Sequence, residues 1–311
     1  MNIRALFDKN KYALSAFVIL AFMTLIYDSF TSAAVTACRL LLCAAAALFL
    51  SAVSAKDITI EKAVMPLFFV ISLISCNAIF LIDDLHILLS LAFFLLAVFF
   101  SSSCRVLTPL FAAFCVFSQP LTLLILVPAI VIVQALKKQK LFAIISVVAG
   151  FAAFIATKLL ENSEFYADQF SSYYLSLHIF HLSTTHKEIL GQYLLCSIPL
   201  LLIGAFYLVK AFINGSRAES IAFVAAILLA VFGYALSQNT QSVFMLLIPL
   251  FASITALDTK TSEQVGGFFA KRLLLLLLTV GISVCAPMLL GTLPYDTELF
   301  SKATFIIFRE Q

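Results

Sequence analysis

Apolar runs long enough to cross a lipid bilayer recur along most of this chain, from residues 13–27 near the start to residues 272–290 near the end. A helix that spans a bilayer needs about 20 predominantly apolar residues. Of the 311 residues, 63% are hydrophobic and only 11% are charged, so polar side chains are too few to coat soluble domains. The sequence therefore predicts an all-α, polytopic transmembrane helix bundle in which residues 1–311 form a single integral membrane domain.

About eleven spans fit into these runs when each takes roughly 20 residues. We expect them at residues 13–27, 34–54, 63–82, 87–102, 141–159, 189–209, 221–236, 243–257 and 272–290, with two more inside residues 106–136. Residues 106–136 are too many for one span, and Ser118-Gln119-Pro120 lies near their centre. Proline interrupts a helix because it has no amide hydrogen and clashes with the preceding turn. We therefore expect a tight hairpin of two short helices there.

The distribution of positive charge predicts the orientation, because loops rich in Lys and Arg remain in the cytoplasm. In the eleven-span topology, fourteen of the 19 Lys and Arg residues fall on the cytoplasmic side, with the N-terminus inside.

The net charge of +3 is too small to indicate a nucleic-acid partner. The seven cysteines lie within apolar runs or at their edges, so structural disulfides are not expected. We expect a multi-pass protein of the bacterial cytoplasmic membrane.

The longest external loop, residues 161–188, has aromatic and apolar residues at helical spacing. This spacing predicts an amphipathic helix that lies in the membrane interface. His178 and His181 are one turn apart on it, so both can address one ligand. A divalent metal, a polar lipid headgroup and simple solvation at the interface all remain open for this pair.

Titratable residues gather on the predicted outer face, where Asp83-Asp84-Leu85-His86 forms a short turn between two spans. Paired carboxylates beside an imidazole can hold a divalent cation or carry out acid–base chemistry. The same aspartates can instead cap the helix that follows, since a carboxylate stabilises free amides at a helix start. Asp28, in the first external loop, has the same two interpretations.

Arg39 is a fixed positive charge within a predicted span, and we expect it to reach toward the outer rim. Together with Lys158 and Lys187 it can meet a phosphate at headgroup level, because guanidinium groups bind phosphate oxygens in a bidentate manner. Contact with ordinary phospholipid is the alternative.

Residues 83–140 resemble the polytopic membrane glycosyltransferases of GT-C architecture. Those enzymes have an external acidic turn, an apolar span, a basic inner turn, a short hairpin with a polar tip that contains proline, and a proline-containing helix that ends in a basic cluster. The matching parts here are Asp83-Asp84, residues 88–100, Arg105, Ser118-Gln119-Pro120, Pro128 and Lys137-Lys138-Gln139-Lys140.

The resemblance implies transfer of a sugar from a polyprenyl-phosphate donor to a glycan acceptor at the outer membrane face. It assigns the general base to an acidic residue of the first external loop, where Asp28 lies, with Asp83 and Asp84 as alternates. Arg39, His86, Lys158, His178, His181 and Lys187 are then the expected substrate-binding residues. No cofactor is assigned from the sequence, and a divalent metal stays an open alternative for these side chains. A transporter or flippase of a lipid-linked or small polar solute, or a non-catalytic membrane subunit, is the alternative.

Overall fold

The computed structural model describes residues 14–22, 24–25, 33–53, 85–160, 202, 205–207, 209–210, 212–214, 217–236, 260–275, 277–279 and 281. Every regular element in this part of the chain is a helix, which confirms the predicted all-α class there. The predicted spans 63–82 and 243–257, and most of 189–209, lie outside the described residues. The count of eleven spans therefore stays a prediction.

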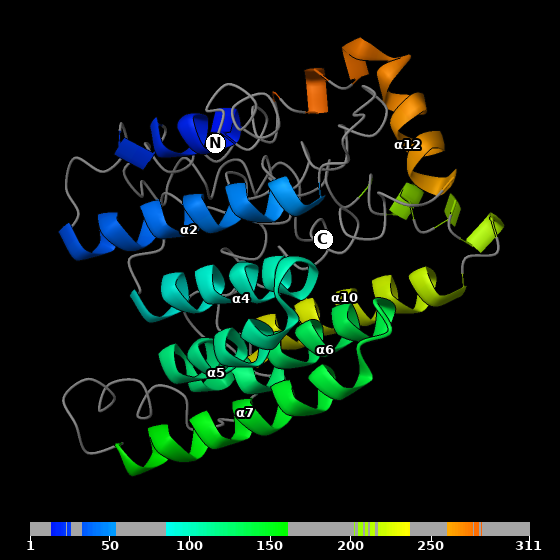
Figure 1. The fold of residues 1–311 in the computed structure, drawn as a ribbon. Coiled ribbons are helices and arrows are strands. Elements are labelled where there is room, and N and C mark those ends of the chain that lie inside the picture. Colours follow the sequence, from blue (N-terminus) through cyan, green and yellow to red (C-terminus); the bar gives the residue numbers. More distant parts are fainter. Residues whose placement is uncertain are drawn as a thin grey trace, which may run out of the picture.

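Three of the described helices are long and apolar enough to cross a membrane: α2 (Ala33–Val53), α4 (Leu85–Ser103) and α7 (Lys140–Leu159). Each matches a predicted span to within two residues at either end. Figure 1 shows α2 and α4 starting on the same side of the bundle, whereas α7 and α10 (Arg217–Leu236) start on the opposite side. The predicted topology gives these helices the same relative directions, while their orientation across a membrane stays a prediction.

The predicted hairpin lies between α4 and α7. After the short 3-10 helix η1 (Arg105–Leu107), the chain forms α5 (Thr108–Ser118), the 3-10 turn η2 (Pro120–Leu124) and α6 (Leu126–Leu136). Gln119 is extended, with φ −145° and ψ 102°, and it ends α5. Pro120 follows at the start of η2, where its missing amide hydrogen costs no helical hydrogen bond. The hairpin prediction is thus confirmed.

The hairpin runs along most of α4, as contacts at its two ends show. At one end His86 Nδ1 lies 3.1 Å from the Ser118 carbonyl oxygen, and at the other Lys137 Nζ donates a hydrogen bond to Ser101 Oγ at 2.7 Å. His86 and Ser101 are about 22 Å apart along the helix axis, given a rise of roughly 1.5 Å per residue. We call these the His86 end and the Lys137 end of the bundle.

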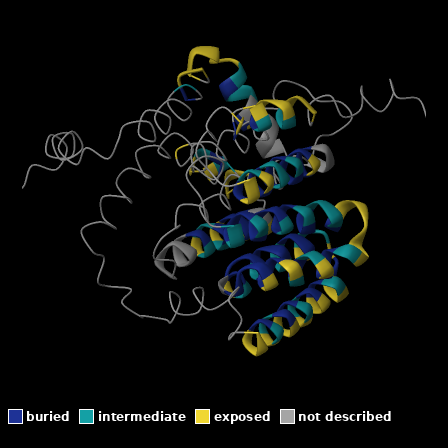
Figure 2. Cartoon of the chain, turned by 90° about the vertical axis from the view of Figure 1, so that its left-hand side faces the viewer, coloured by how far each residue is buried: buried dark blue, intermediate teal, exposed yellow. Residues whose placement is uncertain are grey.

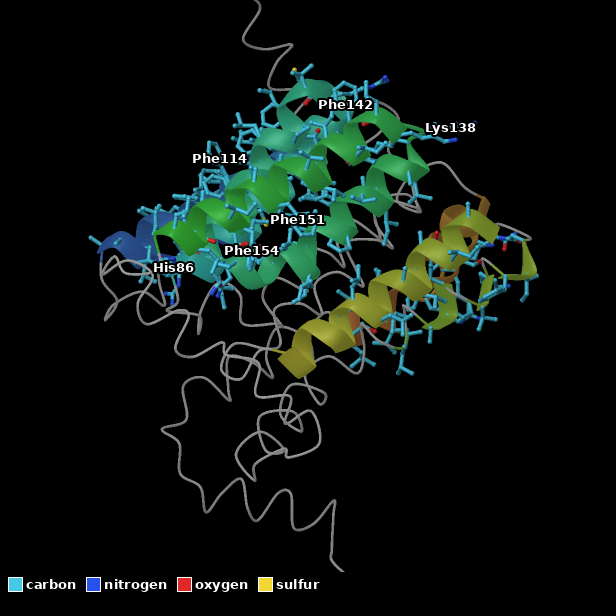
Figure 3. All side chains as sticks on the ribbon, turned by 90° about the horizontal axis from the view of Figure 1, so that it is seen from below. His86, Phe114, Lys138, Phe142, Phe151 and Phe154 are labelled. Atoms are coloured by element: carbon cyan, nitrogen blue, oxygen red, sulfur yellow. The ribbon has the colours of Figure 1, made fainter. Side chains whose placement is uncertain are left out.

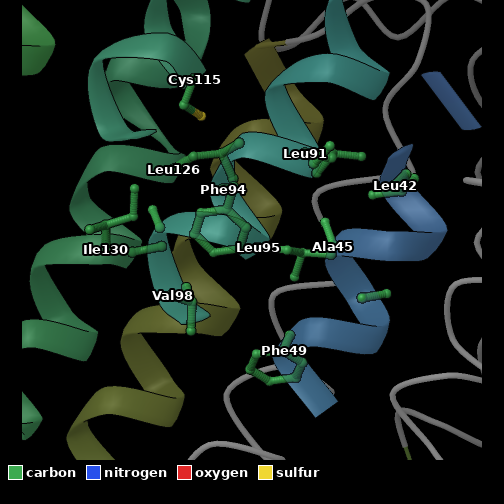
Figure 4. Packing of buried hydrophobic residues seen from close by; sticks show 14 of the residues in the cluster. Leu42, Ala45, Phe49, Leu91, Phe94, Leu95, Val98, Cys115, Leu126 and Ile130 are labelled. Atoms are coloured by element: carbon green, nitrogen blue, oxygen red, sulfur yellow. The ribbon is translucent and has the colours of Figure 1, made fainter. Parts of the chain in front are cut away.

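Helix α4 occupies the middle of the packed core. Figure 4 shows Phe94 and Leu95 of α4 among residues of α2, including Ala45, and residues of α6, including Leu126 and Ile130. The α4–α5 contact adds a stacked aromatic pair, Phe100 on Phe111, with ring centroids 4.9 Å apart. In α4, ten of the 19 residues are buried, against five of the 20 in α7. Helix α7 therefore forms an edge of the bundle, as its exposed stripe in Figure 2 shows.

The exposed stripe of α7 is almost entirely apolar, and its members recur every three or four residues. It comprises Leu141, Ile144, Ile145, Val148, Phe151, Ile155 and Leu159. Such a face suits contact with lipid tails. On the opposite side of α7, a Cβ added at Gly150 would come within 3.2 Å of Leu123 Cδ1 and 3.3 Å of Val127 Cγ2. The missing side chain lets α7 approach the hairpin closely, as small residues do between membrane helices.

Helix α12 (Lys260–Ala270), within the described residues, has no counterpart among the predicted spans. It is amphipathic and buries Val265 and Phe269. Its Phe268 ring lies 4.9 Å from Phe206, and the Arg272 guanidinium lies 4.0 Å from the centre of the Phe268 ring. The interfacial helix that the sequence does predict, in residues 161–188, lies outside the described residues.

Candidate functional site

Three of the predicted site residues lie toward the His86 end of the bundle, each on a different helix. His86 opens α4, Arg39 lies about one and a half turns into α2, and Lys158 lies in the last turn of α7. Figure 1 shows that these helix ends share one side of the bundle, and Figure 3 shows His86 and Lys138 at opposite ends. The residues were predicted to share the outer face, and their helix ends lie on one side of the bundle although the residues span about 120 positions of sequence.

His86 is partly buried and is oriented by the tip of the hairpin. Its Nδ1 lies 3.1 Å from the carbonyl oxygen of Ser118. A carbonyl oxygen can only accept a hydrogen bond, so Nδ1 carries the proton in this contact. In this tautomer the lone pair of the ring is on Nε2.

A buried polar network holds the hairpin tip in place. Ser90 Oγ donates to the Cys115 carbonyl oxygen at 3.0 Å, and Thr122 Oγ1 lies within hydrogen-bond distance of the carbonyl oxygens of Cys115, at 3.1 Å, and Gln119, at 2.6 Å. The Cys115 thiol is free and buried, and it lies 3.1 Å from Ser90 Oγ. These contacts join α4, α5 and η2, so the carbonyl that orients His86 has little freedom to move.

Arg39 is completely buried, with 0% of its surface exposed. The expectation that its side chain reaches out to the rim is therefore wrong, because the protein covers the guanidinium. A guanidinium keeps its charge at physiological pH, and a buried charge is costly unless opposite charge or hydrogen-bond acceptors compensate it. The fold consequently places a permanent positive charge inside the His86 end rather than on its surface.

The remaining predicted site residues lie outside the described residues: Asp28, Asp83, Asp84, His178, His181 and Lys187. Their roles stay predictions. Among the residues that the structure does describe, no three His, Cys, Asp or Glu side chains are grouped so that they could hold a metal ion.

The opposite end of the bundle contains a second polar cluster, whose basic residues were not among the site residues predicted from the sequence. Lys137 Nζ donates hydrogen bonds to Ser101 Oγ at 2.7 Å and to Ser102 Oγ. Gln139 Nε2 donates to the Ser101 carbonyl oxygen at 2.8 Å. The two side chains therefore close the C-terminal end of α4, where free carbonyls and the helix dipole favour a cation.

The Lys137 ammonium is only partly exposed, and this changes its protonation. Burial lowers the pKa of Lys137 from the ordinary 10.5 to about 8, and the positive charge of Arg105 lowers it as well. Lys138 and Lys140 are the other charged residues of the turn that joins α6 to α7, and both are exposed. A fraction of Lys137 is consequently neutral at mildly alkaline pH.

This lowered pKa predicts a stability effect with a definite sign. Between about pH 8 and pH 10.5 the unfolded chain binds more protons than the folded chain, so the wild type becomes more stable as pH rises. Lys137→Met lacks this contribution. We therefore expect the stability of the wild type, relative to that of Lys137→Met, to increase as pH rises from about 7.5 to 9.5. The midpoint of thermal unfolding in detergent measures the difference. Lys138→Met should keep the wild-type pH dependence, whereas parallel curves for wild type and Lys137→Met would contradict the prediction.

Comparison with known proteins assigns no function to either end of the bundle. No family model, no curated protein and no solved structure matches this chain.

Proposed function

We propose that this protein is a membrane glycosyltransferase that moves a sugar from a polyprenyl-phosphate donor to an acceptor at the outer face of the bacterial cytoplasmic membrane. The observation that supports the proposal most directly is a cation inside the His86 end, Arg39, which a donor phosphate would meet once the residues that cover it move apart. A polyprenyl-phosphate donor has a long apolar tail that lipid-facing helices can hold and a charged phosphate. A buried guanidinium matches that phosphate in charge and in geometry.

The proposed reaction needs one base and one group that holds the departing phosphate. The acceptor hydroxyl oxygen attacks the anomeric carbon of the sugar, and its proton passes to Asp28. The bond between the anomeric carbon and the phosphate oxygen breaks, and the electron pair leaves with polyprenyl phosphate. Positive charge at Arg39 stabilises that leaving group as its charge develops.

The other predicted residues have supporting roles in this scheme. Lys158 is exposed at the end of α7, where it can add positive charge for the phosphate, as we propose for Lys187. His86 Nε2 can accept a hydrogen bond from a sugar hydroxyl, and we propose similar contacts for His178 and His181. Asp83 and Asp84 are alternative bases, or ligands for a divalent cation if the reaction uses one.

A transporter or flippase is the second candidate, and buried polar atoms within the spans favour it. In the described part of the chain, the side-chain amide of Gln134 in α6 and the hydroxyl of Ser146 in α7 are buried and make no hydrogen bond. Polar groups inside membrane helices often mark the path of a solute. This function shares the lipid-linked substrate but not the chemical step.

The lipid that stays bound to the purified protein tests the proposal. Native mass spectrometry of the protein in mild detergent should detect a polyprenyl-phosphate sugar. Arg39→Gln should lower its bound fraction about tenfold, the effect of losing one strong charged contact. Lys138→Gln removes one positive charge from the opposite end and should leave binding unchanged. Detection of bulk phospholipid alone, in wild type and both variants, would contradict the proposal.

Turnover separates the two candidate functions. Consumption of the bound donor when a glycan extract is added, with release of polyprenyl phosphate, indicates a transferase. Movement of intact donor across proteoliposome membranes without consumption indicates a flippase.

A further inference from the structure

The Lys137 end concentrates positive charge that α4 to α7 do not neutralise. From residue 85 to residue 160 the sequence contains no Asp and no Glu, yet Arg105, Lys137, Lys138 and Lys140 all fall at this end. Helix α7 also begins here, at Lys140, and the free amides of a helix start favour an anion. The α4–α7 unit thus presents cations at this end without a carboxylate of its own.

The Lys137 ammonium is held in a defined position and still has an N–H donor for a ligand. An ammonium group has three N–H donors, and Ser101 and Ser102 accept from two of them. Ser102 is exposed, and its hydroxyl hydrogen remains available to donate. Arg105 is exposed, and its positive charge is close enough to lower the pKa of Lys137. One lysine N–H, one hydroxyl and one guanidinium are therefore available at this place.

A buried acceptor in the same cluster provides an independent indication of a ligand. Gln139 is only 7% exposed, and its Oε1 atom makes no hydrogen bond in the described structure. Exchanging the oxygen and nitrogen of the Gln139 amide would not satisfy both atoms, because the Ser101 carbonyl oxygen needs the Nε2 donor where it is. A buried acceptor without a partner is costly, so a donor from outside the chain is expected to fill this position.

We propose that the Lys137 end binds a phosphate ester that also carries a hydroxyl group. The phosphate oxygens contact Arg105, Lys137 and the Ser102 hydroxyl, and the ligand hydroxyl donates to Gln139 Oε1. A glycerol-type phospholipid headgroup and a free polyol phosphate share this chemistry. The site lies at the opposite end from the proposed sugar-transfer site and is independent of it.

Binding to the purified full-length protein in neutral detergent tests the proposal. The probes are dioctanoyl phosphatidylglycerol, glycerol phosphate and, as a control, dioctanoyl phosphatidylcholine, which has no net charge and no hydroxyl donor. We expect saturable binding of one or both of the first two and not of the third. Arg105→Gln and Lys137→Gln should each weaken it about tenfold, and Lys138→Gln, which removes the same charge one residue away, less than twofold.

The probes and variants also identify the source of the phosphate and the nature of the attraction. Binding of phosphatidylglycerol alone identifies a lipid headgroup, and competition by glycerol phosphate identifies a soluble ligand. Equal losses in all three variants would show diffuse electrostatic attraction and overturn the proposal, as would equal binding of phosphatidylcholine or no saturable binding. Arg105 is exposed, so its replacement keeps the test valid if Lys137→Gln does not fold.

Discussion

Replacing Asp28 by Asn is expected to abolish sugar transfer while the protein still folds and binds its donor. The amide has nearly the same shape as the carboxylate but cannot take the proton from the acceptor hydroxyl. A positioned general base contributes about 10²–10⁴-fold to rate, so kcat should fall by at least roughly a hundredfold. Because Asp28 is assigned to the base and Arg39 to the phosphate, donor binding should change little.

Loss of donor and release of polyprenyl phosphate, followed by mass spectrometry, measure the transfer, and native mass spectra measure donor binding. Asp83→Asn and Asp84→Asn are the matched comparisons, since each removes one carboxylate from the predicted outer face. A loss confined to one of these two would move the base to that residue. Full activity in all three variants would remove the proposed base altogether.

The positions of the helices were predictable because apolar runs and one proline define them. The run predicted at residues 87–102 became α4, Leu85–Ser103, and the break at Ser118-Gln119-Pro120 became the turn between α5 and α6. Both signals are local: a helix continues while its residues are apolar, and it stops where proline removes an amide hydrogen.

The packing was less predictable because a helix that is apolar all round does not reveal which face meets protein. Helices α4 and α7 are similar in hydropathy, yet one is central and the other is at an edge. Helix α12 was missed for the opposite reason, since its polar residues resemble those of a loop. Its helical face depends on aromatic partners such as Phe206, which is more than fifty residues away.

The candidate site shows the same division between local and long-range information. The sequence identifies His86 and Arg39 by residue type, but the contact of His86 with Ser118 joins positions 32 residues apart. The burial of Arg39 depends on how α2 packs against its neighbours, which composition does not encode. Lys137 was not predicted as a site residue, because its contacts with Ser101 and Ser102 form only when the hairpin returns to α4.

The central position of α4 leads to the largest expected effect on stability, for Phe94→Ala. Phe94 is 2% exposed and is surrounded by residues of α2 and α6 (Figure 4). Truncating a buried phenylalanine removes its dispersion contacts and leaves a cavity, at a cost of about 3–5 kcal/mol. The same truncation at Phe151, which is 54% exposed on α7, should cost much less because lipid tails fill the space. Reversible unfolding in mixed micelles measures both losses, and equal losses at the two positions would contradict the central placement of α4.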